Sequence, residues 1–435
     1  MKTYKVAIVG AGPAGYFTAQ ALQNAANDER NFKIDLIERL PTPWGLVRSG
    51  VAPDHPKIKT VSKVFEKIAN NPDFRLFGNV ELGKDLKLNE LKTKYDAVVL
   101  CTGSAIGKKL GIPGENLANS ISSAEFVPWY NGHPDFEDFK VNLEGKVAIV
   151  IGAGNVAMDC ARILAIDPKE LDETDTADRA MGPLHKSSIR KVYIAGRRGP
   201  EHAAFTAPEL RELVHLENTD VYFNAEEISK AITRANAKEG IDKHVLSNLE
   251  AMKVVTEKEK FNQERAMEFL FLHAPKEIVG TSKVEGVTFG INEVKDGNVI
   301  DTGKTVTIPC DLVISAVGYE SEPYEGVIFE KGKIKNSDGR VCKSTYVVGW
   351  AKRGPSGVIG TNKSDASDVV ALLLEDLDEP KNAGDITDLL PADHLVVDQS
   401  YWSRINEAEV KNGEVKGKPR VKATSFKSLL NLGKN

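Results

Sequence analysis

The stretch Lys5–Gly15 reads KVAIVGAGPAG, an apolar run followed at once by the pattern G-x-G-x-x-G. A short apolar run of this kind is typical of a buried parallel strand, and the next residues, Tyr16–Leu22, favour a helix. A second apolar run, Lys33–Ile37, ends at Glu38. An acid at this place suits the ribose hydroxyls of an adenine nucleotide, so the region predicts a dinucleotide-binding β-α-β unit.

Each residue of the turn has a physical task in such a unit. Gly10 allows the tight turn, Gly12 lets the backbone approach a pyrophosphate, and Gly15 lets the helix pack closely on the strand. Pro13 and Ala14, within the turn, are candidate cofactor-binding residues as well, and the N-terminal N–H groups and dipole of the following helix attract phosphates. An α/β turn that binds nothing is the alternative, and the strand, helix and acid around this pattern disfavour it.

A second cycle starts at the apolar run Lys146–Ile151 and continues into GAGNVA at residues 152–157. This is a G-x-G-x-x-A pattern, and alanine in the third position is common in turns that bind NADP. The candidate phosphate-binding residues here are Gly152, Gly154, Asn155 and Val156.

The strand Lys191–Ala195 ends in GRRGP, at the place where the first cycle has Glu38. An acid suits a ribose 2′-hydroxyl, whereas Arg197 and Arg198 suit a 2′-phosphate through charge-assisted hydrogen bonds. A solvated pair of surface charges is the alternative. The second cycle therefore predicts NADP(H) and not NAD(H).

Composition sets the class of protein. The 435 residues favour two or three domains, and 41% hydrophobic with 27% charged residues is ordinary for a globular protein. A net charge of −5 argues against nucleic acid and anionic membranes as partners, and the apolar runs have strand length, so we expect no membrane insertion. The N-terminus enters a strand at once, which leaves no room for a targeting peptide and predicts a cytoplasmic protein.

The four cysteines are isolated, so we expect neither a redox dithiol, nor a metal site, nor an iron–sulfur cluster in the chain itself. They are Cys101, Cys160, Cys310 and Cys342.

Two further segments look functional. Leu40–Pro56 contains four prolines and two glycines, which indicates a long structured loop. Thr345–Asp365 reads as a strand, a glycine-rich loop and the start of a helix. The N-terminus of that helix could face an isoalloxazine ring and favour the anionic reduced flavin; a third phosphate loop is the alternative, although the Walker pattern is absent. We interpret the last 50 residues as a packing tail.

Several motifs together make the chain resemble the adrenodoxin reductase family, especially its bacterial NADPH–ferredoxin reductase branch. They are GAGPAG, RSGVAPDHP at 48–56, GNVA at 154–157, GRRGP at 196–200, the run 205–212 and the run 349–360. The resemblance covers nearly the whole chain. It implies an α/β fold with two Rossmann-like three-layer domains: a discontinuous FAD domain, 1–105 and 320–435, and an inserted NADP domain, 106–319.

The resemblance also implies roles for individual residues. FAD would lie on the first turn, with Glu38 on its ribose, and along Leu46, Val80, Trp350, Gly357, Val358 and Ile359. NADPH would lie on the second turn, with Arg197 and Arg198 on its 2′-phosphate and with Glu209 and Gly357 near its nicotinamide end. His55, Glu212 and Asp159 would stand close to the reacting rings, the first two as a pair. A loop-bracing role for His55 and a plain surface carboxylate at Asp159 are the alternatives.

The implied activity is that of a ferredoxin–NADP⁺ reductase. A hydride would pass from NADPH to flavin N5, and single electrons would pass on to a ferredoxin-type iron–sulfur protein. An FAD- and NADPH-dependent monooxygenase and a nucleotide-binding redox sensor without turnover are the alternatives. Residues 220–265 lack a recognisable basic docking patch, so the docking surface stays open. Gly107–Lys109 lacks an arginine common in the family, so a cofactor contact at that place stays open too. We expect a monomer or a dimer.

Overall fold

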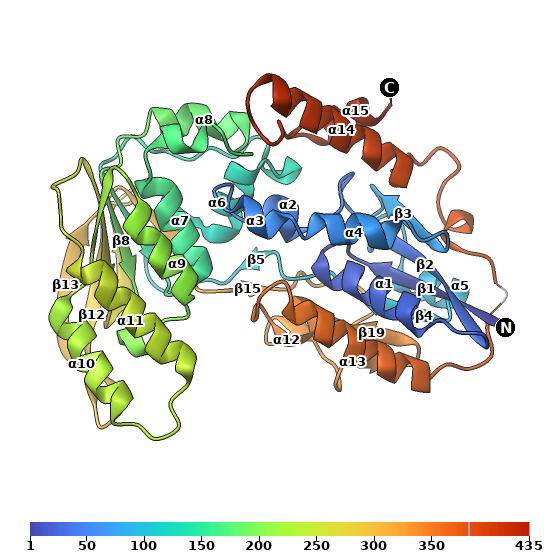
Figure 1. Ribbon diagram of the computed structural model, residues 1–435, viewed down its shortest axis with the longest axis horizontal. Coiled ribbons are helices and arrows are strands. Elements are labelled where there is room, and N and C mark those ends of the chain that lie inside the picture. The colour runs from blue at the N-terminus through green and yellow to red at the C-terminus, as the bar shows by residue number, and fades with distance from the viewer. Residues whose placement is uncertain (382, 435) are drawn as a thin grey trace. The chain divides into compact units, whose positions relative to one another are not determined.

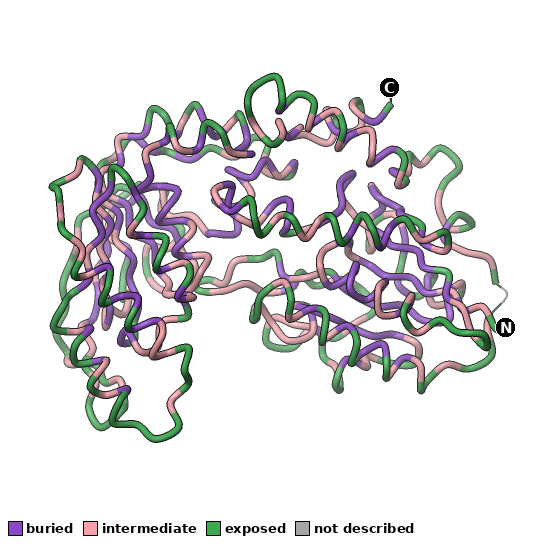
Figure 2. The backbone as a smooth tube through the Cα atoms, in the orientation of Figure 1, coloured by how far each residue is buried: buried purple, intermediate pink, exposed green. Residues whose placement is uncertain are grey.

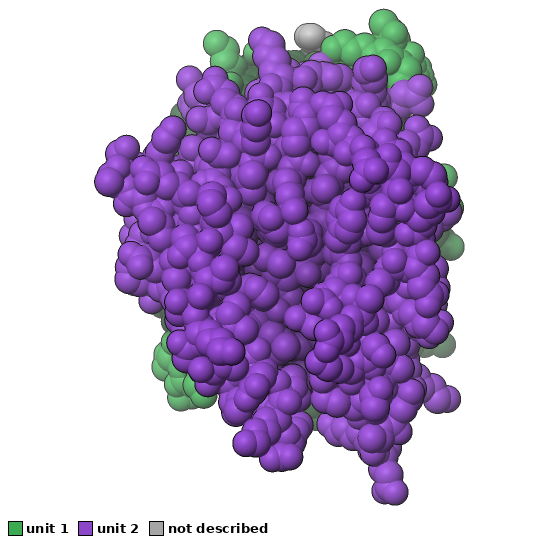
Figure 3. Space-filling model, turned by 90° about the vertical axis from the view of Figure 1, so that its left-hand side faces the viewer, with its two compact units in different colours: residues 1–106, 131–137, 319–435 green, residues 107–130, 138–318 purple. Residues whose placement is uncertain are grey.

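The computed structural model describes residues 1–381 and 383–434, and the chain divides into two compact units (Figures 1 and 3). Unit 1 comprises Met1–Ile106, Asn131–Glu137 and Tyr319–Asn435; unit 2 comprises Gly107–Tyr130 and Asp138–Gly318. Residues 131–137, which the sequence places in the inserted segment, thus belong to unit 1. The Arg39 guanidinium holds them there by donating to both carboxylate oxygens of Asp135, at 3.1 and 2.7 Å.

Unit 1 is built on a six-stranded sheet in the order β18-β19-β4-β1-β2-β3. All neighbours are parallel except β18 and β19. The central strand β4 and the second half of its neighbour β1 are apolar and buried because both faces of the sheet are covered. The strands are β1 (Lys2–Val9), β2 (Arg30–Glu38), β3 (Phe74–Gly78), β4 (Ala97–Leu100), β18 (Arg340–Cys342) and β19 (Thr345–Val347).

Helices cover both faces of this sheet, which gives the unit three layers. Helices α1 (Pro13–Ala25) and α13 (Thr361–Glu375) pack against each other on one face. The same apolar core contains residues of α4 (Ser62–Ala69), α14 (Gln399–Val415) and α15 (Phe426–Gly433). The opposite core contains residues of α5 (Leu88–Lys94), η5 (Ile386–Asp388) and the hairpin β16 (Phe329–Glu330) and β17 (Lys333–Ile334).

Unit 2 repeats the plan with a second parallel six-stranded sheet, β6-β14-β7-β8-β10-β9. Its strands β7 and β14, like β1 and β4 of unit 1, consist largely of buried residues (Figure 2). The strands are β6 (Ser120–Ser122), β7 (Val147–Ile151), β8 (Lys191–Ala195), β9 (Thr219–Tyr222), β10 (Arg265–Leu270) and β14 (Leu312–Ser315).

The two faces of this second sheet are covered differently. One face packs on helices α6 (Ser123–Asn131), α7 (Asn155–Ala165), α8 (Asp178–His185), α9 (Ala207–Glu212), α10 (Ala225–Asn236) and α11 (Lys243–Glu257). The other packs on an antiparallel sheet of β11 (His273–Val279), β12 (Gly286–Lys295) and β13 (Asn298–Pro309). Helix, sheet and sheet make the three layers here, and the predicted pair of Rossmann-like units is confirmed.

Short elements complete the chain. They are α2 (Leu46–Ser49), α3 (Pro56–Lys59), α12 (Trp350–Arg353), β5 (Ile106–Gly107), β15 (Tyr319–Glu320), η1 (Pro134–Phe136), η2 (Pro168–Leu171), η3 (Pro200–His202) and η4 (Leu213–His215). Among the described residues, no helix combines the length and the apolarity needed to span a bilayer.

Candidate nucleotide-binding sites

The first glycine turn joins β1 to α1, and packing within the protein itself requires two of its glycines. Gly10 has a φ of +106°, and a Cβ there would lie 2.4 Å from the carbonyl oxygen of Cys101. A Cβ at Gly15 would lie 2.0 Å from the carbonyl oxygen of Gly10. These positions tolerate only glycine because the strand, the turn and the helix approach one another so closely.

Gly12 is different, because only one atom of the protein lies close to the place that its side chain would take. Its φ of −85° is open to any residue, and a Cβ there would meet only the Cα of Gly45, at 3.9 Å. No side chain caps the start of α1 at this point. The first turn of α1, at Pro13 and Ala14, therefore begins beside open space, which is what a pyrophosphate needs.

Glu38 ties the neighbouring loop to this turn. Its Oε2 accepts a hydrogen bond from the Ala11 N–H and its Oε1 accepts one from the Leu40 N–H, both at 2.9 Å. Burial raises the pKa of this carboxyl, and the two backbone bonds oppose that rise. The acid predicted for the ribose is thus held rigidly at the end of β2, beside the glycine turn.

Unit 2 repeats this arrangement. A Cβ at Gly152, whose φ is +151°, would lie 2.3 Å from the carbonyl oxygen of Ala316. A Cβ at Gly154 would meet only the Cβ of Ala204, at 3.9 Å. Gly154 precedes α7 without a side-chain cap, so this turn also has one glycine fixed by packing and one beside open space.

The next two residues of α7 are Asn155 and Val156. The side-chain oxygen of Asn155 accepts the Thr206 N–H at 3.0 Å, which fixes the segment before α9 to the turn. Val156 packs, partly buried, against the core of the unit.

The loop after β8 presents both predicted arginines. Its backbone is anchored by three bonds: Gly196 accepts from the His273 N–H at 2.9 Å, Arg197 from the Asn292 side chain at 2.8 Å, and Arg198 from the Leu272 N–H at 3.1 Å. Both arginine side chains are exposed, and neither has a protein partner among the described residues. A rigid loop with two uncommitted guanidinium groups fits a phosphate monoester.

An arginine that the sequence analysis missed joins two predicted residues. Arg162 on α7 is buried, and its guanidinium donates to Asp159 Oδ1 at 2.7 Å and to Glu209 Oε2 at 3.4 Å. Asp159 is thus ion-paired within α7, and its place near the reacting rings stays a prediction. The three-residue spacing of Asp159 and Arg162, which share one helix face, is the signal that could have revealed the pair.

His55 and Glu212 belong to different units. His55 is buried just before α3, and its Nε2 lies 4.0 Å from Asp54 Oδ1. Glu212 is the last residue of α9. Their pairing stays a prediction, as do the catalytic roles of both.

Residues predicted to line the flavin lie in three segments of unit 1. Leu46 and Val358 are apolar and yet 44% and 64% exposed, whereas Val80 is buried and donates its N–H to the Glu38 carbonyl at 3.0 Å. Trp350 stacks on Tyr319 with ring centroids 6.1 Å apart. Exposed apolar side chains beside a nucleotide turn fit a flat, largely apolar ring system.

An acid on α13 holds the glycine-rich segment in place, and the sequence analysis missed it too. Asp365 accepts from the Gly349 N–H at 2.7 Å, from Lys352 Nζ at 2.8 Å and from Arg353 Nη1 at 2.8 Å. Gly357 has a φ of +82°. Ile359, next along, packs partly buried against the core that contains α13.

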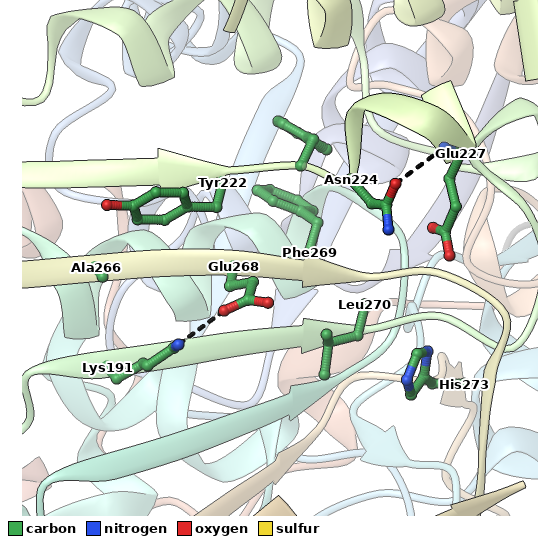
Figure 4. Close-up of a pocket in the computed structure, with 10 residues that line it drawn as sticks. Lys191, Tyr222, Asn224, Glu227, Ala266, Glu268, Phe269, Leu270 and His273 are labelled. Atoms are coloured by element: carbon green, nitrogen blue, oxygen red, sulfur yellow. Dashed lines mark hydrogen bonds and ion pairs between the residues drawn. The ribbon is translucent and has the colours of Figure 1, made fainter. Parts of the chain in front are cut away.

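A separate cavity of about 490 Å³ lies in unit 2, and none of the predicted site residues lines it (Figure 4). Its Lys191 is paired with its own Glu268 at 2.7 Å, and Asn224 caps α10 by accepting the Glu227 N–H. Because polar groups of this cavity bind one another in this way, the glycine turn at residues 152–157 is the better nucleotide site of unit 2. The lining residues are Lys191, Tyr222, Phe223, Asn224, Glu227, Ala266, Glu268, Phe269, Leu270 and His273.

Comparison with known proteins agrees with this arrangement. A family model described as pyridine nucleotide-disulphide oxidoreductase matches residues 4–349. The chain is 44% identical to NADPH-ferredoxin reductase FprA of Mycobacterium tuberculosis, with 100% of both chains covered. It is 38% identical to mitochondrial NADPH:adrenodoxin oxidoreductase of Arabidopsis thaliana, covering 99% of this chain and 95% of that one.

A solved structure, Mycobacterium tuberculosis FprA in complex with NADPH, superposes over 100% of both chains with a TM-score of 0.95. The chain therefore belongs to the pyridine nucleotide-disulphide oxidoreductases and, within them, to the family of the NADPH-ferredoxin and NADPH:adrenodoxin reductases.

Proposed function

We propose that this protein is an NADPH–ferredoxin reductase that holds FAD in unit 1 and NADPH in unit 2. One observation supports this above all: each unit has a turn in which one glycine is fixed by packing and the next stands beside open space. The first turn is followed by an acid and the second by two arginines, as FAD and NADPH require.

FAD, when bound, supplies the chemistry, because a flavin accepts a hydride and can release its electrons one at a time. The residues of unit 1 bind and orient it. Gly12 admits the pyrophosphate, Glu38 faces the ribose, and Leu46, Val80 and the segment from Trp350 to Ile359 cover the ring system. The start of α13 would add a positive dipole end near the ring.

NADPH is selected and oriented by unit 2. Arg197 and Arg198 bind the 2′-phosphate, and Gly152, Gly154, Asn155 and Val156 admit the pyrophosphate. Arg162 holds Asp159 and Glu209 together, which would orient Glu209 toward the nicotinamide end, where Gly357 would also lie. We assign His55 and Glu212 to the same end, where an imidazole next to a carboxylate can hold a proton.

The acceptor is a ferredoxin-type iron–sulfur protein, and the compartment is the cytoplasm. All four cysteines are free thiols, and three of them are buried, which fits a reducing compartment. The acceptor must carry the iron–sulfur centre, since the cysteines of this chain are isolated in its sequence.

The test is the reduction of cytochrome c by NADPH with and without an added [2Fe–2S] ferredoxin. The proposal predicts reduction that rises with ferredoxin concentration and saturates. NADPH consumption that yields an oxygenated product, without ferredoxin dependence, would identify a monooxygenase instead. Bound FAD that NADPH never reduces would identify a redox sensor.

A further inference from the structure

Unit 1 contains a completely buried carboxylate that the proposed mechanism does not use. Glu409 lies on α14 with its side chain 0% exposed. Arg48, itself only 6% exposed, donates Nη1 to Oε2 at 2.7 Å and Nη2 to Oε1 at 2.6 Å. A bidentate ion pair at such distances fixes the orientation of the two side chains and the position of α2 along α14.

Two more donors complete the surroundings of this carboxylate. Arg420 Nη1 lies 3.3 Å from Oε2, and the Ala423 N–H donates to Oε1 at 2.9 Å. A buried carboxylate is stable only when its oxygens are satisfied in this way. Burial alone would raise the pKa of Glu409, but the neighbouring Arg48 and Arg420 lower it, so the group is ionised at neutral pH.

Arg48 belongs to a segment that borders the nucleotide turn. It lies on α2, which begins directly after Trp44 and Gly45. The Trp44 N–H donates to the Ala11 carbonyl at 2.8 Å. A Cβ at Gly45 would lie 2.8 Å from the Cα of Gly12, so the segment touches the glycine that stands beside open space.

A second contact from α14 reaches the same segment. The Trp402 ring meets the Trp44 ring edge-on, with centroids 4.9 Å apart and an angle of 85°. Trp402 and Glu409 are seven residues apart, so they lie on one face of α14. That face holds the segment at two points, Trp44 and Arg48.

We propose that Glu409 is a positioning residue for the flavin nucleotide: through Arg48 it holds the segment 44–49 against Gly12 and so determines how tightly unit 1 retains FAD. The inference rests on the proposed function, because it requires FAD at the first turn. Helix α14, in the C-terminal tail, would thus contribute to cofactor binding in addition to packing.

The test measures FAD affinity in three variants prepared as holoprotein: Glu409→Gln, Arg48→Lys and the double variant. We expect each single variant to weaken FAD binding about tenfold. The double variant should be no weaker than Arg48→Lys alone, because Glu409 acts through Arg48. Glu407→Gln, on the exposed side of the same helix, is the matched control and should bind FAD as the wild type does.

Affinity for NADP⁺ separates positioning from general damage to the fold. We expect calorimetry to give NADP⁺ dissociation constants within about twofold of wild type, since unit 2 is unchanged. Unaltered FAD affinity in Glu409→Gln, additive effects in the double variant, or parallel loss of NADP⁺ binding would each overturn the inference. If Glu409→Gln does not fold, Arg48→Lys, which keeps the positive charge, is the deciding variant. Weaker FAD binding in it supports the inference, and unaltered FAD binding overturns it. A wild type that binds no FAD would contradict the proposed function itself.

Discussion

Gly12 and Gly15 stand three residues apart in one turn and have different neighbours, so their substitution should have different effects. Gly12→Ala adds a methyl group beside open space. We expect FAD affinity to fall at least about tenfold while the stability of the apoprotein changes by no more than ~1 kcal/mol.

Gly15→Ala is the matched comparison, because its methyl group would meet the Gly10 carbonyl. We expect a loss of about 3 kcal/mol of stability together with the loss of FAD. Thermal unfolding of apoprotein and flavin fluorescence titrations measure both quantities. Equal destabilisation by the two variants would show that Gly12, too, serves packing.

The two arginines of the loop after β8 allow a second prediction about single residues. Replacing Arg197 and Arg198 together by alanine removes both guanidinium groups from an otherwise anchored loop. We expect KM for NADPH to rise about 100-fold, because two charge-assisted hydrogen bonds to the 2′-phosphate are lost. KM for NADH, which lacks that phosphate, should change little. Steady-state kinetics with both nucleotides measure this, and equal effects on the two would remove the 2′-phosphate assignment.

The sequence identifies residues whose task depends on local spacing, such as the glycines of both turns and Glu38. It does not identify Asp365 or Glu409, because each acts on partners brought close by the fold. It misses Arg162 as well, although the spacing of Arg162 and Asp159 is local and only the contact of Arg162 with Glu209 depends on the fold. Glu409 and Arg48 are 361 positions apart, and nothing in the chain around either residue points to the other.

Helices α12 and α13 together hold the glycine-rich segment that begins at Gly349. Asp365 on α13 accepts the Gly349 N–H and two side-chain cations from α12. We expect Asp365→Asn to weaken FAD binding about tenfold, since the amide cannot pair with both cations. Asp368→Asn, exposed on the same helix, should not change FAD affinity; flavin fluorescence compares the two, and equal affinities would contradict the role of Asp365.

Element boundaries follow the sequence where periodicity is strong and depart from it elsewhere. The strands at both turns lie where the apolar runs predict them. The sequence of residues 58–70 alone favours a single helix, whereas the structure has α3 and α4, interrupted between Lys59 and Ser62. The β-branched Thr60 and Val61 stand at this break, and such residues have weaker helix propensity.

At the scale of the molecule, an ionic link joins separate parts of unit 1 and makes its stability depend on pH. Arg75 on β3 donates to Asp35 on β2 at 2.7 Å and to Asp385 at 2.9 Å. Burial alone would raise the pKa of Asp385, but bonds from Thr387 and Arg75 outweigh it and lower the pKa to about 2. A lowered pKa stabilises the fold above the ordinary value near 3.8, and that stabilisation is lost as pH falls toward 2.

Asp385→Asn should therefore reduce the free energy of unfolding by about 1 kcal/mol at pH 7, a value discounted for solvent screening. The difference from wild type should shrink between pH 4 and pH 2, where the carboxylate becomes protonated. Urea unfolding across this range measures it, with the exposed Asp393→Asn as control. A difference that stays constant with pH would contradict the ionic origin.

The sequence predicts the two-unit plan because the fold repeats one pattern, and both copies keep their glycines, strands and charged residue after the second strand. The sequence does not predict which elements cover the faces of the two central sheets. The antiparallel sheet of β11, β12 and β13 covers one face of unit 2 where a helix is the usual cover, and alternating patterns alone do not tell which face a strand will cover.

The most direct test of the whole account is a visible absorption spectrum of the purified protein during anaerobic titration with NADPH and, separately, NADH. We predict a flavin spectrum that NADPH bleaches at far lower concentration than NADH, because we assign FAD to the first glycine turn and the 2′-phosphate of NADPH to Arg197 and Arg198 on the loop after β8. A colourless protein that does not take up FAD, or a flavin that NADPH does not reduce, would contradict it.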